Sequence, residues 1–248
     1  MNQKIFWLSI VAITGSFIGG FLLANALNRS ELTALRGENE RLKSSSRETA
    51  QNQSEFNLSD EEIKARILEA DSNPENYAFQ KNLGLALYRY AAMKQNTELL
   101  AEVGRLLNRA FENNKKDYDV IVTLGNTYFD IGYFKKDNAQ FEKSREYYTA
   151  ALQIKPNDVD VRTDLGLTYF LIDPPENGKA IGEFQKSLQV NPKHEKTLQV
   201  MTQVYLNENN LTKAEDHLAK LKQVNAGNQY IAELETRLSQ LRGATQKQ

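Results

Sequence analysis

Few residues of this sequence have a type and spacing that could support catalysis or metal binding. Its 248 residues include two histidines, His194 and His217, and no cysteine. Neither histidine stands at metal-ligand spacing from the other, so both are interpreted as surface residues. The absence of cysteine excludes disulfides, thiolate metal sites and a cysteine nucleophile.

Two other motifs fall short of the chemistry that they suggest. Gly178-Lys179 lacks the upstream glycine and the following serine or threonine of a phosphate-binding loop. The adjacent carboxylates of Glu61 and Glu62 are expected on an exposed helix face and not in an apolar pocket. No nucleophile is paired with a base. We therefore predict that the protein is not an enzyme and that it uses no cofactor and no metal.

Composition narrows the class of protein further. The chain has 31 basic and 32 acidic residues, so it carries no general field that would attract nucleic acid. Only 5 prolines and 13 glycines are present, which favours helices over short strands and turns. We expect a helical protein that does not bind nucleic acid.

The N-terminal residues 1–28 predict a membrane segment. Residues 5–23 are uncharged and mostly apolar, and as a helix they would span about 28 Å, close to the thickness of a bilayer core. Lys4 and Trp7 stand where a cytoplasmic cation and an interfacial aromatic residue are expected. The alternative is a cleaved signal peptide, because residues 24–26 have the small-x-small form of a cleavage site.

Both interpretations place the following domain outside the cytoplasm. We expect a single-pass protein of a bacterial inner membrane, with its folded domain in the periplasm or at the cell exterior, because the tail before the helix is very short. The inverted topology stays open, since the basic residues after the helix outnumber Lys4 plus the amino terminus. These residues are Arg29, Arg36, Arg41, Lys43 and Arg47.

Residues 29–57 are expected to connect the membrane segment to the folded domain. Four of them follow a coiled-coil seam, which predicts a short stalk, and the polar residues 44–57 predict a flexible linker. Gly15 and Gly19 have the spacing that lets two membrane helices approach closely, so a homodimer is an alternative. The seam consists of Leu32, Leu35, Asn39 and Leu42.

The remaining residues, 58–248, contain copies of one helical pattern. A first helix carries Leu-Gly-x-x-Tyr, a second helix carries Ala-x-x-x-Phe, and a proline ends the second helix because it cannot continue the hydrogen-bond ladder. The pattern resembles the tetratricopeptide repeat (TPR), a helical hairpin of about 34 residues. In the most regular copy these residues are Leu165, Gly166, Tyr169, Ala180, Phe184 and Pro192.

Four repeats are predicted, at 77–116, 118–157, 159–193 and 195–228, flanked by capping helices. Gly84, Gly125 and Gly166 follow one another at intervals of 41 residues, so the first two repeats should have lengthened helices or longer turns. Ser59 and Glu62 predict a capping box at the start of the folded part. Further pattern residues are Leu83, Leu124, Tyr128, Tyr205 and Ala214.

The resemblance implies an all-α fold, a right-handed solenoid of helical hairpins behind the single transmembrane helix. It also implies a concave groove, lined by the first helices, that binds a peptide or protein. Tyr88, Phe129 and Phe170 would form an aromatic strip there, and the alternative is that these rings pack only between neighbouring hairpins. The full predicted set is Lys81, Leu85, Tyr88, Arg89, Val122, Asn126, Phe129, Asp130, Thr163, Leu167 and Phe170, followed by Gln199, Gln203 and Asn207 of the fourth repeat.

One known ligand mode of the family is a cluster of lysine, asparagine and arginine that clamps a terminal carboxylate. Lys81 matches one of its positions, but Leu85, Thr123, Asp160 and Asp164 replace the other residues. Aspartates would instead make the middle of the groove acidic, which favours a basic or neutral peptide. These are Asp119, Asp130, Asp160 and Asp164.

We therefore predict a membrane-tethered interaction protein, a scaffold, assembly factor or chaperone whose partner is another protein or peptide. Its layout resembles that of tethered TPR proteins of cytochrome c maturation and of the secretion translocon. That likeness is one of organisation only. The alternative is a structural homo-oligomer.

Overall fold

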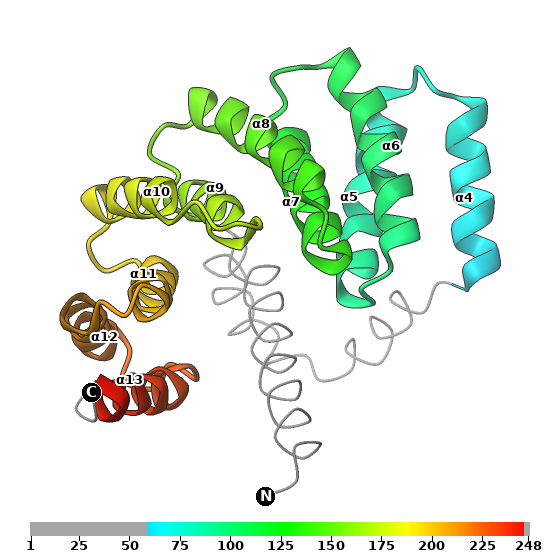
Figure 1. The fold of residues 1–248 in the computed structure, drawn as a ribbon. Coiled ribbons are helices and arrows are strands. Elements are labelled where there is room, and N and C mark those ends of the chain that lie inside the picture. The colour runs from blue at the N-terminus through cyan, green and yellow to red at the C-terminus, as the bar shows by residue number, and fades with distance from the viewer. Residues whose placement is uncertain (1–58, 246–248) are drawn as a thin grey trace, which may run out of the picture. The chain divides into compact units, whose positions relative to one another are not determined.

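The computed structural model describes residues 59–245, and this part of the chain consists of ten α-helices with no β-strand (Figure 1). The predicted membrane segment, stalk and linker lie outside the described residues. Across residues 59–245, no helix combines the length and apolarity needed to cross a bilayer. The helices are α4 (Asp60–Ser72), α5 (Tyr77–Met93), α6 (Thr97–Asn113), α7 (Tyr118–Lys135), α8 (Asn138–Ile154), α9 (Val159–Leu171), α10 (Asn177–Val190), α11 (Glu195–Asn207), α12 (Leu211–Val224) and α13 (Ile231–Thr245).

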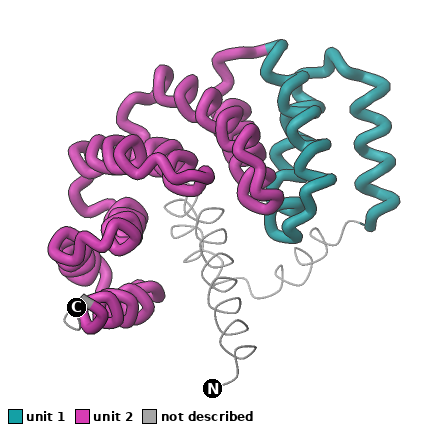
Figure 2. The backbone as a smooth tube through the Cα atoms, in the orientation of Figure 1, with its two compact units in different colours: residues 1–113 teal, residues 114–248 magenta. Residues whose placement is uncertain are grey.

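The chain divides into two compact units, residues 1–113 and residues 114–248 (Figure 2). In the described part of the first unit, α5 and α6 form a hairpin, and α4 packs against α5. The second unit contains the hairpins α7–α8, α9–α10 and α11–α12, and α13 packs against α11 and α12. Within this unit, the second helix of each hairpin also contacts the next helix along the chain.

The 41-residue spacing of the glycines comes from longer helices. Helices α5, α6 and α8 have 17 residues and α7 has 18, whereas α9 and α11 have 13 and α10 and α12 have 14. The turns inside the two long hairpins are short, residues 94–96 and 136–137. Each long hairpin thus gains about one helical turn per helix. The longest turn inside a hairpin, residues 172–176, lies instead between α9 and α10.

Side chains at the helix starts satisfy backbone N–H groups that have no partner within the helix. The predicted capping box is confirmed, because the Glu62 N–H donates to Ser59 Oγ at 3.3 Å and the Ser59 N–H donates to Glu62 Oε2 at 2.8 Å. Asp117 and Asp158 cap α7 and α9 in the same way, accepting from Val120 and Val161. Local residue chemistry therefore determines where these helices begin.

The glycine of each of the first three hairpins lies where two helices touch. A Cβ atom at Gly125 would lie 2.6 Å from the ring of Tyr148, and one at Gly166 would overlap the ring of Phe184. A Cβ atom at Gly84 would lie 2.5 Å from the Cδ2 atom of Leu107. A side chain at any of these positions would have to displace its neighbour, so the glycines allow the close contact of the two helices.

Tyrosines of the repeat pattern are covered by lysines of the following helix. The Lys143, Lys179 and Lys213 ammonium groups lie 5.3, 5.6 and 5.2 Å from the ring centroids of Tyr128, Tyr169 and Tyr205. Each lysine directly precedes the small residue of the second helix, Ser144, Ala180 or Ala214. The first hairpin has Leu87 and Glu102 at the corresponding positions, so the aromatic ring and its cation are replaced together.

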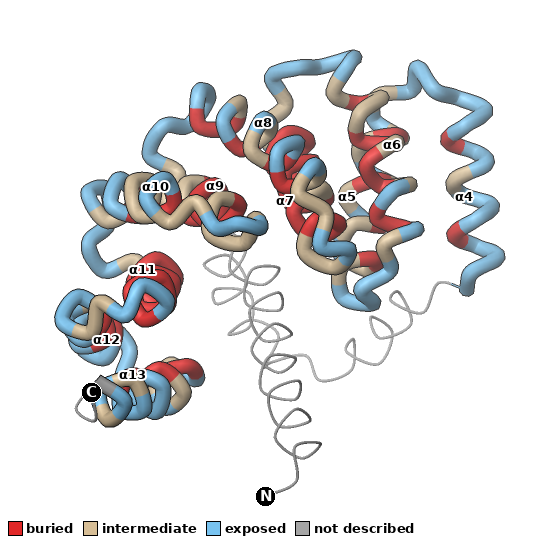
Figure 3. Tube along the Cα trace, viewed as in Figure 1, coloured by how far each residue is buried: buried red, intermediate tan, exposed pale blue. Residues whose placement is uncertain are grey.

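The first helices of the second unit are buried more fully than the second helices. Figure 3 shows buried residues concentrated on α7, α9 and α11, while α8, α10 and α12 keep broad exposed faces. Tyr148 and Phe184 are large side chains of second helices that contact Gly125 and Gly166 of the first helices, and both are fully buried. The core of each hairpin therefore lies on the side that faces the first helix.

We predict that Gly166→Ala destabilises the second unit by about 2–3 kcal/mol, because the new methyl group must displace a buried aromatic ring. Gly84→Ala should cost less, about 1 kcal/mol, since the Leu107 methyl group can rotate away. Gly182→Ala is the matched control, because nothing lies within 4 Å of its Cβ position, and it should stabilise the helix slightly. Urea unfolding measures all three, and an equal cost for Gly166→Ala and Gly182→Ala would contradict the contact.

Three turns between helices contain a non-glycine residue with a positive φ angle, namely Gln95 at 52°, Lys136 at 56° and Asn209 at 55°. In each case the next residue, an asparagine or aspartate, caps the following helix. The left-handed conformation costs an ordinary side chain about 1–2 kcal/mol. Gln95 is exposed, so its conformation is imposed by the turn and not by packing.

Gln95→Gly should therefore raise the free energy of unfolding by about 0.5 kcal/mol, the relief of strain less the added entropy of the unfolded chain. Gln95→Ala is the control, because it keeps the Cβ atom in the strained conformation and should give no gain. Thermal unfolding of Gln95→Gly, Gln95→Ala and the wild type measures the change in stability that each substitution causes. Equal stabilisation by alanine and glycine would show that the side chain, and not the φ angle, is responsible.

Candidate functional site

The predicted groove residues of the first unit lie on α5. Lys81, Leu85 and Tyr88 are partly buried and Arg89 is exposed. These four residues therefore place an aromatic ring and two cationic side chains at or near the surface of their own unit.

The predicted groove residues of the second unit lie on α7 and α9 and are mostly buried. Val122 and Asn126 are each 6% exposed, and Asp130 is 1% exposed. Asn126 Oδ1 accepts a hydrogen bond at 2.8 Å from the Tyr148 hydroxyl, so the same tyrosine that contacts Gly125 also orients this amide. Leu167 is buried as well, and Phe170 is partly buried.

Phe129 packs inside its own hairpin. It is 1% exposed, and its ring centroid lies 5.6 Å from that of Phe141 on α8 in an edge-to-face arrangement. The ring is thus used in the core, but its printed contact lies within one hairpin, whereas the alternative that the sequence left open placed it between neighbouring hairpins. An aromatic strip made of Tyr88, Phe129 and Phe170 is therefore not an exposed surface feature.

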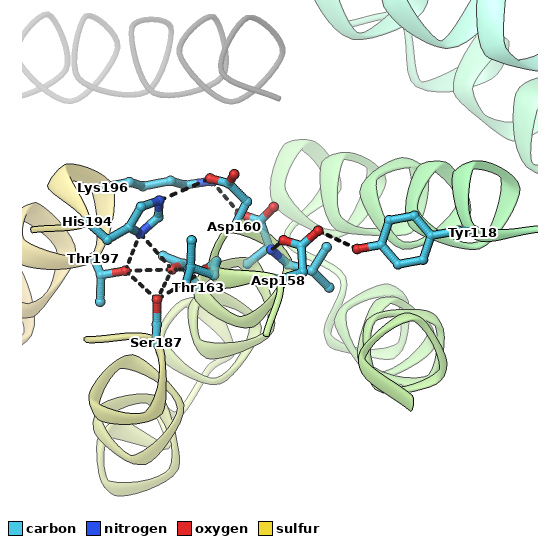
Figure 4. A network of polar contacts seen from close by, with 11 residues as sticks. Tyr118, Asp158, Asp160, Thr163, Ser187, His194, Lys196 and Thr197 are labelled. Atoms are coloured by element: carbon cyan, nitrogen blue, oxygen red, sulfur yellow. Dashed lines mark hydrogen bonds and ion pairs between the residues drawn. The ribbon is translucent and has the colours of Figure 1, made fainter. Parts of the chain in front are cut away.

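Thr163 belongs to a hydrogen-bonded cluster that joins α9, α10 and α11 (Figure 4). Its Oγ1 atom lies 2.6 Å from Thr197 Oγ1 and 3.1 Å from Ser187 Oγ. His194 Nδ1 lies 2.7 Å from Thr197 Oγ1, and His194 Nε2 lies 3.2 Å from Asp160 Oδ1. The cluster links two hairpins through groups that are mutually satisfied.

The cluster contains a hydroxyl, an imidazole and a carboxylate in the order of a catalytic triad. Its hydroxyl, however, is not accessible to a substrate. Thr197 is fully buried, and its hydroxyl already contacts those of Thr163 and Ser187. A buried hydroxyl with these partners cannot meet a substrate. His194 therefore holds neighbouring hairpins together, and the prediction that it is a surface residue is wrong, since its side chain is 14% exposed.

A buried ion pair connects α9 and α11. The Lys196 ammonium donates to Asp164 Oδ1, and the two side chains are 9% and 1% exposed. The pair compensates the charge of Asp164, and Asp160 contacts His194, so two of the four aspartates that were expected to make the centre acidic have partners within the fold. Lys196 was not among the predicted residues, although it stands one repeat after Asp160, at the corresponding position of the pattern.

Gln199 and Gln203 continue the polar residues along α11. They are 4% and 6% exposed, and the Nε2 atom of each is buried without a hydrogen-bond acceptor. We call the polar set on the three neighbouring helices α7, α9 and α11 the first-helix row. It consists of Asn126, Asp130, Asp164, Lys196, Gln199 and Gln203.

The first-helix row offers amides, carboxylates and one ammonium group, but no reactive nucleophile. In the range 59–245, no cluster of histidine, aspartate and glutamate is arranged to hold a metal ion. The arrangement is suited to non-covalent recognition through hydrogen bonds.

Comparison with known proteins agrees with the hairpin pattern. A sequence model of the tetratricopeptide repeat matches residues 125–158, which cover most of α7 and all of α8. No curated protein matches the chain by sequence.

Solved structures share the fold at low sequence identity. The crystal structure of MamA is 17% identical with a TM-score of 0.52, and the match covers 77% of this chain and 94% of that one. For the MamA RS-1 ArsTM double mutant the identity is 16%, the TM-score 0.54 and the coverage 81% and 97%. TTC0263, a thermophilic TPR protein of Thermus thermophilus, is 15% identical with a TM-score of 0.51 and coverage of 73% and 88%.

The second histidine, His217 on α12, is also less exposed than predicted. Its side chain is 13% exposed, its Nδ1–H donates to the Lys213 carbonyl at 2.8 Å, and its ring centroid lies 5.2 Å from that of Tyr205. Burial lowers the pKa of His217 below its usual value near 6.5, and the nearby cation of Lys220 acts in the same direction. The hydrogen bond to Lys213 and the carboxylate of Asp216 oppose this shift without cancelling it.

Because the pKa of His217 is lower in the folded than in the unfolded chain, the unfolded chain takes up more protons once the pH falls below about 6.5. The free energy of unfolding should therefore fall between about pH 7.5 and pH 5.5, and His217→Gln should reduce this loss. Urea unfolding of the wild type and of His217→Gln at several pH values in this range measures how the free energy of unfolding depends on pH. His194 is present in both proteins, so a difference between their profiles comes from His217. Parallel pH profiles would show that His217 does not contribute.

Proposed function

We propose that this chain, built as a tetratricopeptide repeat protein, is a non-enzymatic interaction module that binds another protein or a peptide through its first-helix row. One observation carries the proposal. The first helices of three successive hairpins are neighbours, and they bring polar side chains of complementary kinds into one continuous row. Recognition by a few buried polar groups within an apolar frame is typical of protein–protein binding sites.

The location of this module is proposed from the sequence. The apolar residues 5–23 support a membrane tether, which would place the repeats beside a bilayer, on the periplasmic or outer side of a bacterial inner membrane. A tethered module of this kind would act as a scaffold, assembly factor or chaperone. A chaperone of the cytochrome c maturation type is one such role, and its only support is the similar layout.

A homo-oligomer is the second candidate. Gly15 and Gly19 in the apolar segment, and the leucine seam from Leu32 to Leu42, support self-association of the N-terminal part. In this case the first-helix row would stay available for a partner, so the two candidates are compatible.

The proposal predicts that a partner is lost when the α7 end of the row is changed. Asn126→Ala combined with Asp130→Asn removes an amide and a charge, and it should weaken partner capture at least about tenfold, since a hydrogen bond to a charged group contributes about 1.5–3 kcal/mol. Proximity labelling in cells with the full chain measures the capture. Circular dichroism confirms that the variant is folded.

Gln189→Ala combined with Glu142→Gln is the matched control, because it also removes an amide and a charge, but at exposed positions of the second helices α10 and α8. The control should keep the partner that the double variant loses. An unchanged set of labelled proteins in the double variant would refute binding through the row. Labelling dominated by the chain itself in both variants would favour the homo-oligomer.

A further inference from the structure

Helix α4 is held to the first unit by few apolar contacts. Only Ile63 and Ala70 of its 13 residues are buried, and Figure 3 shows most of the helix exposed. By contrast, α6 of the adjacent hairpin buries seven of its 17 residues. An isolated helix of the length of α4 is only marginally stable in water, so α4 depends on its contacts with the rest of the unit.

Polar contacts join the C-terminal turn of α4 to both helices of the hairpin. From α5, Gln80 Nε2 donates to the Ala70 carbonyl at 2.7 Å. From α6, Arg105 Nη2 donates to Asp71 Oδ2 at 3.1 Å, and Arg109 Nη1 donates to Asp71 Oδ1 at 2.6 Å. Arg105 Nη1 also donates to Oδ1 of the same carboxylate. A single aspartate thus connects α4 with α6 through two arginines.

Arg105 and Arg109, which we call the arginine pair, form a site for one carboxylate. They are four residues apart, so they project from the same face of α6, one turn from each other. The N–H groups of a guanidinium form a planar fork that matches the two oxygens of a carboxylate. Glu102 accepts from Arg105 Nε at 2.9 Å and holds this guanidinium in place.

The arginine pair and the carboxylate that it binds are accessible from solvent. The side chains of Asp71, Arg105 and Arg109 are 36%, 34% and 30% exposed. Hydrogen bonds from Arg105 and then from Arg109 lower the pKa of Asp71, so this side chain is charged at neutral pH. Ion pairs with this exposure contribute little net stability, because water and salt screen them. A carboxylate from another molecule can therefore replace that of Asp71 at low cost.

We propose that the arginine pair binds an acidic segment of a partner protein, and that Asp71 occupies this site in the unbound chain as an internal competitor. Binding of the partner displaces Asp71 and releases α4 from α6. Clustered arginines are a general means of recognising acidic motifs. The inference goes beyond the proposed function, since the site lies on a second helix of the first unit and uses no residue of the first-helix row.

The internal competitor determines the kind of partner. Residues 73–76 join α4 to α5, so Asp71 stays near the arginine pair at an effective concentration on the order of millimolar. A lone carboxylate does not compete with Asp71 at lower concentrations. A segment with several neighbouring glutamates or aspartates does, because each of its carboxylates can enter the site in turn. Binding should weaken strongly with salt, since opposite charges drive it.

The first arm of the test measures binding of a defined probe, a fluorescein-labelled peptide of six glutamates with an amidated C-terminus. Fluorescence anisotropy with the full chain should show at least about tenfold tighter binding to Asp71→Asn than to the wild type, because the competitor loses its charge. Glu69→Gln is the matched control, since it removes the same charge from α4, but from a side chain paired with Arg66 of the same helix. It should leave the affinity nearly unchanged.

The second arm identifies the residues that bind the probe. In the Asp71→Asn chain, Arg105→Gln combined with Arg109→Gln should abolish binding. The control in the same chain is Lys115→Gln combined with Lys116→Gln, which removes two cations at exposed positions of the turn after α6 and should keep binding. A peptide of six glutamines should bind none of these proteins. Circular dichroism confirms that each variant is folded.

The third arm follows the release of α4 by amide hydrogen exchange. A saturating concentration of the glutamate peptide should speed exchange in α4 of the wild type at least about tenfold, because local opening of a helix exposes its own amides. Exchange in α5 and α6 should not change. Asp71→Asn should show fast exchange in α4 without the peptide.

Each arm has an outcome that would overturn the proposal. An equal gain in binding for Asp71→Asn and Glu69→Gln would show that only the net charge of α4 matters, and no gain for either would show that Asp71 does not compete. Binding that survives the loss of both arginines would place the peptide elsewhere. Exchange in α4 that is the same with and without the peptide would contradict its release.

Discussion

The close approach of two helices within a hairpin is the constraint on which the rest of this structure depends. At Gly84, Gly125 and Gly166 the backbone of the first helix lies so near the second helix that a Cβ atom would overlap a buried side chain. The rings of Tyr148 and Phe184 fill the contacts at the second and third of these glycines. Because the Tyr148 hydroxyl then reaches Asn126, the same contact positions a polar side chain of the first-helix row.

The polar side chains between the hairpins of the second unit fall into two groups. The first group is satisfied within the fold, by the ion pair of Lys196 with Asp164 and by the cluster around Thr163. These interactions hold α9, α10 and α11 together and leave little reactivity. The second group is the pair of amides on Gln199 and Gln203, whose donors are not used by the fold. Polar contacts between hairpins are therefore concentrated at the third and fourth hairpins.

The distribution of polar and aromatic side chains changes where the residues that select a binding partner are expected. An aromatic strip along the longer hairpins would have placed it on Tyr88, Phe129 and Phe170, but Phe129 is used in packing against Phe141. The lengthened helices α5 to α8 extend the hairpins by about one turn each, which gives these hairpins more core. Hydrogen-bonding groups of the first-helix row, and not aromatic rings on the longer hairpins, are the better candidates for recognition.

By itself, the sequence determined the helical hairpins, the capping box at Ser59 and the 41-residue spacing of the glycines in the first three hairpins. These features depend on local chemistry and on a repeated spacing, both of which can be seen without knowing which hairpin meets which. The tertiary structure decided the pairing of Lys196 with Asp164, the burial of Phe129, the partial burial of His194, and the lack of an acceptor for the two glutamines. Each of these features depends on a neighbouring helix that packing brings close. The position of a side chain around its own helix does not show whether a hydrogen-bond partner will lie opposite it.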